Sequence, residues 1–232
     1  MFQIYLYRDP GNPDRRLALL QDAARTIAPH LTEADLSIGR SRAGKTFFTS
    51  PAAAGLRFSI SHSGGLWACI LGKSPCGIDL QENRSCRQDA IAARFFSDAE
   101  ADYVKQTGLF GFYRIWTRRE AFAKFTGLGF FGMAGELPDF GERDETGQRD
   151  ETGQRDETGE TGGDKDGKQV RLRNFVIWNG QKVWFHEVGV HDAGVHETAA
   201  GTGFTMVWCS TEEKGEAEIV DRREEAEQPA NP

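Results

Sequence analysis

The sequence predicts an α+β fold, because stretches with strand periodicity and stretches with helix signals both occur along the chain. Apolar and polar residues alternate at the N-terminus, in M-F-Q-I-Y-L-Y, which indicates a first strand. Apolar residues recur at helical spacing from Pro13 to about Ala28, and Pro29 ends that segment. From Cys76 onwards the predicted order is strand, helix, helix, helix.

A polar turn between two strands is the next predicted feature. The segment from Phe58 to Leu71 is typical of two strands, with S-H-S-G-G between them at residues 61–65. The hydroxyls, imidazole and open backbone amides of this turn suit a phosphate group. Just upstream, R-S-R-A-G-K from Arg40 to Lys45 brings together three cations, before a strand that is expected to start near Thr46.

A short strand is predicted at C-G-I-D-L-Q, residues 76–81. Successive side chains of a strand point to opposite faces. We therefore expect Asp79 and Gln81 on one face, and Ile78 and Leu80 on the other.

Helix signals follow this strand. Residues 87–96 have a helical composition, with Ile91 and Phe95 on a buried face. The sequence S-D-A-E from Ser97 to Glu100 matches a capping box, which begins a second helix. That helix is expected to run to about Thr107 and to stop at Gly108.

The third predicted helix holds W-T-R-R-E-A-F-A-K, residues 116–124, and Gly127 is expected to end it in the left-handed conformation. Glu120 and Lys124 are four residues apart and share a face. Magnesium prefers oxygen ligands, usually one or two carboxylates together with waters and substrate phosphates. Asp79 and Glu120 are the candidate carboxylates. Taken alone, however, Asp79 is more typical of a turn at a strand end than of a metal ligand, and Glu120 with Lys124 is more typical of a solvated helix pair.

The run F-S-I-S-H-S-G-G, then C-G-I-D-L-Q, then W-T-R-R-E-A-F-A-K-F-T-G resembles the phosphopantetheinyl transferases of the broad-specificity Sfp type, in order and in spacing. The resemblance covers roughly Gly44 to Gly127, and G-F-T-M-V-W-C-S at residues 203–210 resembles the final strand of that family. It implies an α+β protein of two similar, pseudo-twofold-related halves, each a small sheet packed with helices. Coenzyme A would bind in the cleft between them.

The resemblance also implies an enzyme that transfers the phosphopantetheine arm of coenzyme A to a serine of an apo acyl or peptidyl carrier protein. The reaction would need Mg²⁺ and would release adenosine bisphosphate. Attack on a diphosphate develops charge on its oxygens, so a metal ion and a lysine suffice as catalysts. The carrier protein brings its own nucleophile.

Carried over by position, Asp79 and Glu120 are expected to bind the metal, and Glu120 also to take the proton of the attacking serine, directly or through water. Many members of the family have a third acid two residues after the aspartate, where this chain has Gln81. A neutral amide oxygen binds magnesium more weakly than a carboxylate. Gln81 is therefore expected to be a second-choice ligand or to hold a water molecule.

Four residues are expected to contact coenzyme A. Ser61 and His62 resemble contacts of the family, with His62 at the ribose phosphate, and Lys124 matches the lysine that reaches the diphosphate. Lys45 matches the lysine of a G-K-P segment, in which Thr46 here replaces the usual proline. This replacement concerns the geometry of the loop and leaves its charge unchanged.

Two other functions stay open from the sequence. A metal-dependent diphosphate hydrolase would use the same carboxylates, with water as the nucleophile and coenzyme A or a related nucleotide as the substrate. A non-catalytic module that binds carrier protein or coenzyme is the third interpretation, because the third acid is missing. The carrier protein and its pathway, fatty-acid, polyketide or nonribosomal peptide synthesis, are not specified by any motif.

A repeated histidine pattern, H-E-V-G-V-H-D-A-G-V-H-E, contains His186, His191 and His196. Zinc-binding helices place histidines four residues apart. Histidines five residues apart do not share a face of a helix, and on a strand they lie on opposite faces. We therefore predict a strand from Lys182 to Val190 followed by a loose connection, and no metal site there.

Two segments are nearly free of apolar residues, which lowers the hydrophobic content to 38%. Residues 141–168 repeat R-D-E-T-G-Q nearly three times and are predicted to be a disordered insertion. Residues 211–232 are predicted to be a disordered charged tail. The remaining chain is predicted to divide into an N-terminal half, 1–74, and a C-terminal half, 75–210.

Charge and cysteine content indicate which partners and which cellular compartment to expect. The insertion and the tail each carry a net charge of −5, so the chain's −7 leaves about +3 for the ordered part. A mildly basic body fits a polyanionic coenzyme and an acidic carrier protein, and nothing indicates nucleic acid. Cys69 and Cys209 lie in apolar strands and no signal sequence or membrane-spanning run is present, so a reduced, cytoplasmic monomer is expected.

Overall fold

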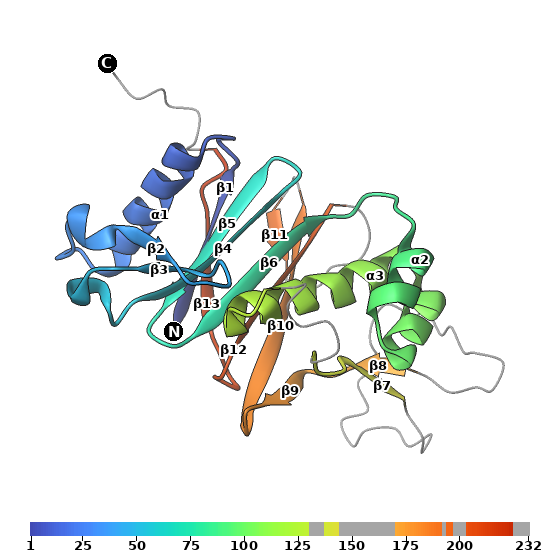
Figure 1. Cartoon of the computed structure of the whole chain (residues 1–232). Helices are drawn as coiled ribbons and strands as arrows, with labels where there is room; N and C mark the ends of the chain where they lie inside the picture. Colours follow the sequence, from blue (N-terminus) through green and yellow to red (C-terminus); the bar gives the residue numbers. More distant parts are fainter. Residues whose placement is uncertain (130–136, 144–169, 192–193, 197–202, 225–232) are drawn as a thin grey trace.

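The structure, a computed structural model, describes residues 1–129, 137–143, 170–191, 194–196 and 203–224 (Figure 1). The predicted insertion, residues 141–168, therefore lies outside the described residues except for residues 141–143, which form a short strand, so the prediction of disorder is wrong for them. Within the described ranges, no helix is both long and apolar enough to cross a lipid bilayer.

The described elements confirm the α+β prediction. The N-terminal part contains β1 (Phe2–Arg8), α1 (Pro13–Ile27), β2 (Ile38–Arg40), β3 (Thr46–Phe48), β4 (Arg57–Ser63) and β5 (Leu66–Gly72), with short 3₁₀ helices at Ala34–Leu36 and Pro51–Ala53. The C-terminal part contains β6 (Cys76–Glu82), α2 (Gln88–Phe95), α3 (Asp98–Thr126), β7 (Gly141–Arg143), β8 (Val170–Leu172), β9 (Phe175–Trp178), β10 (Gln181–His191), β11 (Gly194–His196), β12 (Phe204–Ser210) and β13 (Ala217–Asp221).

Two larger sheets form the body of the protein. The first has the order β13-β1-β5-β4, and the second has the order β11-β10-β12-β6, with β9 paired to β10. Figure 1 shows α1 beside the first sheet and α3 running across the second. The pseudo-twofold relation between the halves and the division near residue 74 stay predictions.

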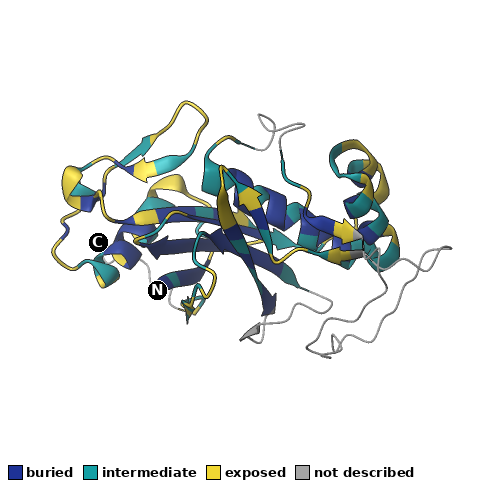
Figure 2. Cartoon of the chain, turned by 90° about the horizontal axis from the view of Figure 1, so that it is seen from below, coloured by how far each residue is buried: buried dark blue, intermediate teal, exposed yellow. Residues whose placement is uncertain are grey.

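Apolar side chains fill both faces of the second sheet. Alternate residues of β12 separate cleanly: Met206 and Trp208 pack between the two sheets, whereas Val207 and Cys209 pack against α3. The same alternation in β6 sends Ile78 and Leu80 between the sheets. Figure 2 shows both sheets as mostly buried strands, with exposed residues at their periphery.

Close packing of α3 against β6 depends on Gly77. A Cβ atom at this position would lie 2.1 Å from the carbonyl oxygen of Ala121 and 2.7 Å from the amide nitrogen of Phe125. Only a residue without a side chain therefore allows the backbone of α3 to approach β6 this closely. The approach brings the C-terminal turns of α3 next to Asp79.

The predicted limits of α3 are confirmed. Ser97 accepts a hydrogen bond from the amide of Glu100, the Glu100 carboxylate accepts one from the amide of Ser97, and Gly127 ends the helix with φ 74°. Gly108 interrupts the helix with φ 64° and ψ −145°, although helix geometry resumes directly after it. The two predicted helices are thus one element with a break.

The prediction of a disordered tail from Thr211 is wrong for residues 211–224. Ala217–Asp221 forms β13, which pairs in parallel with β1. Ala217 and Ile219 pack between the sheets, and Val220 packs on the other face of the first sheet. A short strand of this kind is hard to recognise in a charged segment, because only three of its side chains are apolar.

Two further expectations change with the structure. Residues 211–224 carry six acids and three bases, so counting them with the ordered part removes its predicted charge of about +3. The expected loose connection after Val190 is instead a hairpin in which β11 pairs with the end of β10.

A chain that ends at Glu216 lacks β13. We expect it to lose about 3 kcal/mol of unfolding free energy, because it gives up several backbone hydrogen bonds and the partial burial of Ile219 and Val220. Urea denaturation followed by circular dichroism measures the loss. The matched control is a chain that ends at Glu224, which keeps β13; equal stability of the two truncated chains would contradict the assigned role of this strand.

Candidate active site

Asp79 is the centre of a buried polar cluster on the α3 face of β6. Its side chain is only 3% exposed. Its Oδ1 accepts hydrogen bonds from the Ser61 hydroxyl at 2.7 Å and from the Lys124 ammonium at 2.7 Å. Its Oδ2 accepts one from the Gln81 amide at 2.9 Å, so the prediction that Asp79 and Gln81 share a face is confirmed.

Glu120 lies one helical turn before Lys124 on α3. Burial raises its pKa from 4.5 to about 7, with a further upward contribution from the negative charge of Asp79 and an opposing one from Lys124. The two carboxylates that the sequence singled out therefore act on each other electrostatically, although about forty residues separate them.

The donor set fits a divalent, oxygen-preferring cation. Among the described residues no group of three or more His, Cys, Asp or Glu side chains gathers in one place. Asp79, Glu120 and the amide of Gln81 nevertheless supply the two carboxylates and one neutral oxygen that magnesium commonly takes from a protein. A cation between the carboxylates would relieve the repulsion that helps to raise the pKa of Glu120.

Ser61 and His62 are neighbours on β4 but lie in different surroundings. Ser61 is buried and bonds to Asp79 and Lys124. The His62 side chain is 56% exposed, and its Nδ1 lies 3.9 Å from the carboxylate of Asp9. Partial burial and the charge of Arg16 lower the pKa of His62. The structure thus places only Ser61 in the Asp79 cluster.

Lys45 connects the N-terminal part of the chain to the end of α3. Its ammonium donates a 2.6 Å hydrogen bond to the carbonyl of Phe125, and its side chain packs against Gly127. Burial lowers its pKa. Lys45 is therefore anchored at the end of α3, and its described contacts do not include the residues of the Asp79 cluster.

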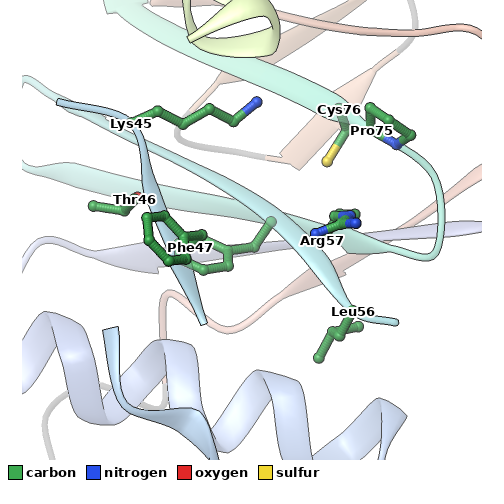
Figure 3. A pocket seen from close by; sticks show the side chains of 8 residues that line it. Lys45, Thr46, Phe47, Leu56, Arg57, Pro75 and Cys76 are labelled. Carbon is green, nitrogen blue, oxygen red and sulfur yellow. The ribbon is translucent and has the colours of Figure 1, made fainter. Parts of the chain in front are cut away.

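Lys45 also lines a cavity of about 240 Å³ (Figure 3). Thr46 and Phe47 lie beside it, and the start of β4 and the start of β6 supply the rest of the wall. Those wall residues are Leu56, Arg57, Phe58, Pro75 and Cys76. Two cationic side chains and several apolar ones thus meet in one hollow, next to the end of α3.

Buried ion pairs hold α3 in place, and these were missed by the sequence analysis. Arg114 and Arg118 both bind the carboxylate of Glu187 on β10, at 2.8 Å and 2.7 Å. Arg119 pairs with Glu100, which is fully buried. Two adjacent arginines among the large apolar residues of this helix are the signal that acidic partners lie nearby, because charged groups are rarely buried unpaired.

His186 does not join the Asp79 cluster. Its ring stacks on Trp208, with centroids 4.0 Å apart and planes 15° apart, and burial lowers its pKa. The side chains of His191 and His196 lie outside the described residues. The prediction that these three histidines form no metal site therefore stays a prediction.

Comparison with known proteins gives a family match over the segment that carries this cluster except for Ser61. A family model described as the 4'-phosphopantetheinyl transferase superfamily matches residues 75–163. This range includes Asp79, Gln81, Glu120 and Lys124.

Curated relatives show the same similarity. A 4'-phosphopantetheinyl transferase of Bacillus subtilis is 33% identical over 132 residues, which is 50% of this chain and 57% of the relative. The 4'-phosphopantetheinyl transferase Sfp of Bacillus subtilis (strain 168) is 37% identical over 78 residues, 31% of this chain and 34% of the relative. The 4'-phosphopantetheinyl transferase psf-1 of Bacillus pumilus is 38% identical over 76 residues. The matches thus span from about a third to somewhat over half of the relatives' length.

Glu120→Gln should flatten the pH dependence of stability in the absence of metal. Between pH 4.5 and about 7 the folded protein binds more protons than the unfolded chain, so wild-type stability falls as the pH rises through this window. The glutamine cannot ionise. The unfolding free energy of the variant, relative to that of the wild type, should therefore rise by about 1–3 kcal/mol from pH 5 to pH 8.

Urea denaturation in EDTA at the two pH values measures this difference. Added Mg²⁺ should shrink it, because a bound cation favours the ionised carboxylate. If the difference in unfolding free energy between variant and wild type were the same at pH 5 and pH 8, the pKa of Glu120 would not be raised. Glu33→Gln, at an exposed position, is the matched control.

Gln81→Glu should strengthen divalent-metal binding by about tenfold, because a carboxylate is a better magnesium ligand than an amide. The same change replaces the hydrogen bond to Asp79 by a like-charge contact, so the metal-free variant should be less stable than the wild type. Isothermal titration with Mg²⁺ and with Mn²⁺ measures the first effect, and thermal unfolding in EDTA the second. Weaker metal binding by the variant would exclude residue 81 as a ligand position.

Proposed function

We propose, from the premise that residues 75–163 belong to the 4'-phosphopantetheinyl transferase superfamily, that this protein transfers the phosphopantetheine arm of coenzyme A to a serine of an apo carrier protein. One observation carries the proposal. Asp79 on β6 and the pair Glu120 and Lys124 on α3 come from two parts of the matched segment, and their charges interact beside β6. Such a cluster suits a diphosphate and a divalent cation.

In this proposal Asp79 and Glu120 hold a magnesium ion, with Gln81 as the neutral third ligand or as the holder of a water molecule. When bound, the ion supplies positive charge that stabilises the diphosphate oxygens during phosphoryl transfer. Hydrogen bonds from Ser61 and Lys124 fix the orientation of the Asp79 carboxylate.

Glu120 is the proposed acceptor of the proton from the attacking carrier serine. Support for this role comes from its place on α3, one helical turn before Lys124, where its charge and that of Asp79 act on each other. The carrier serine then attacks the β-phosphorus of coenzyme A, and the bond from that phosphorus to the bridging oxygen breaks. Adenosine bisphosphate leaves with the bridging oxygen.

Lys124 is the proposed stabiliser of charge on the diphosphate. An ammonium group has three protons, and Lys124 donates to Ser61 and to Asp79, which leaves one proton for a substrate oxygen among the described contacts. Two fixed partners hold the amine in place before substrate arrives, so little reorganisation is needed.

Lys45 and His62 are the proposed contacts to the nucleotide end of coenzyme A. Support comes from the surroundings of each residue: Lys45 lines the cavity at the end of α3, and His62 is exposed beside Asp9 and Arg16. A cytoplasmic location and a monomeric state remain predictions from the sequence.

The direct test is incubation with coenzyme A, Mg²⁺ and a panel of apo carrier proteins. A phosphopantetheine mass increase on the carrier serine, seen by intact-protein mass spectrometry, is expected. Glu120→Gln and Asp79→Asn should each slow transfer about 100-fold or more, since one removes the base and the other a metal ligand. Glu33→Gln, at an exposed site, should match the wild type.

The same reactions separate the other candidate functions. Loss of coenzyme A without any carrier protein would indicate a diphosphate hydrolase. Binding of the carrier protein without turnover would indicate a non-catalytic module. Either result, obtained with the whole carrier panel, would refute the proposed transfer.

A further inference from the structure

Three serines at alternate positions of β4 join the two sheets. Ser59, Ser61 and Ser63 accept hydrogen bonds from the backbone amides of Ile78, Leu80 and Glu82, at 3.1 Å, 3.2 Å and 3.0 Å. Each pair is 19 residues apart in sequence, so β4 and β6 run side by side in the same direction. We call this row of three bonds the serine seam.

The serine seam takes the place of backbone pairing. One edge of β6 pairs with β12 through backbone hydrogen bonds. On its other edge, three backbone amides donate hydrogen bonds to serine hydroxyls instead of to backbone carbonyl groups. Because side chains alternate along a strand, the three serines project from one face of β4. The seam therefore sets the register of β6, and with it the position of Asp79.

Besides its bond in the seam, Ser61 makes two further described hydrogen bonds. Its hydroxyl donates to Asp79 Oδ1 at 2.7 Å and accepts from the Lys124 ammonium at 2.8 Å, in addition to the Leu80 amide. A serine hydroxyl has one donor and two acceptor sites. All three are occupied within the protein, and the residue is only 6% exposed.

A saturated hydroxyl is poorly suited to substrate binding. A direct contact with coenzyme A would have to break one of the three bonds, and each broken bond would leave a buried polar group unpaired. The sequence-based expectation that Ser61 contacts coenzyme A therefore conflicts with its geometry. The bonds it does make lead to the two groups proposed for catalysis.

We propose that Ser61 is a positioning residue that fixes the Asp79 carboxylate and the Lys124 ammonium relative to each other, and that it does not bind the substrate. This inference rests on the proposed function for its kinetic consequences. Its structural content is independent of that function: without the hydroxyl, the described contacts that hold Asp79 are those from Gln81 and Lys124, and the Lys124 ammonium is restrained by Asp79 alone. Weaker binding of a divalent cation and slower turnover should follow, with little change in the affinity for coenzyme A.

The test compares Ser61→Ala with Ser59→Ala. Ser59 is equally buried and also loses one seam bond when truncated, but among its described contacts it does not touch Asp79 or Lys124. For Ser61→Ala we expect at least a tenfold fall in kcat, less than a threefold change in KM for coenzyme A, and at least a fivefold higher Mn²⁺ concentration for half-saturation. Ser59→Ala should stay within threefold of the wild type in all three.

Electron paramagnetic resonance of free Mn²⁺ measures metal binding directly, so the inference can be tested even if the protein transfers nothing. A raised KM for coenzyme A with unchanged kcat would make Ser61 a substrate contact and overturn the proposal. Equal effects of Ser61→Ala and Ser59→Ala in the Mn²⁺ titration would reduce Ser61 to a seam residue, which also overturns it.

Ser61→Cys covers the case in which Ser61→Ala does not fold. A thiol is similar in size but a weaker donor, so an intermediate loss of Mn²⁺ affinity is expected. A cysteine variant equal to the wild type in Mn²⁺ binding would contradict the positioning role. Thermal unfolding of every variant in EDTA shows which ones are folded.

Discussion

The hydrogen-bonded carboxylate of Asp79 is the interaction on which the rest of the site depends. It lies where three elements meet: β6 carries it, β4 supplies Ser61, and α3 supplies Lys124. A buried carboxylate that lacked these partners would be costly, because its charge has been removed from water. The three elements are therefore held together by the same bonds that orient the charged groups, so stability and the chemistry of the site share one origin.

The position of α3 is decided by contacts on both of its sides. Toward β6, Gly77 lets the helix backbone come within van der Waals distance of the strand. Elsewhere on the helix, Arg118 and Arg119 are 3% and 6% exposed and pair with Glu187 and Glu100. Such pairs stabilise little in net terms, but each gives a large penalty to any arrangement that separates the partners. These contacts fix the position of the helix, and with it the positions of Glu120 and Lys124.

The strand β13 shows why composition misleads at the end of the chain. Ala217–Asp221 sits within a charged stretch, and its apolar residues are few. The strand is nevertheless stable because β1 offers a row of backbone groups, and backbone hydrogen bonds do not depend on side-chain type. Sequence patterns report side chains, so a strand whose partner is more than 200 residues away leaves only a faint pattern of its own.

The sequence by itself determined the elements whose causes are local. Two strand-like runs around a polar turn predicted β4 and β5, and alternation predicted the faces of β6. The Ser97–Glu100 box and Gly127 limited α3. The order of three motifs indicated the family and the residues Asp79, Glu120 and Lys124. Only the tertiary structure decided that Ser61 bonds to Asp79, that Glu187 receives Arg118, and that β13 joins β1. The reason is physical: periodicity and capping act between near neighbours, whereas these bonds join residues that are distant in the chain and adjacent only after the sheets have packed.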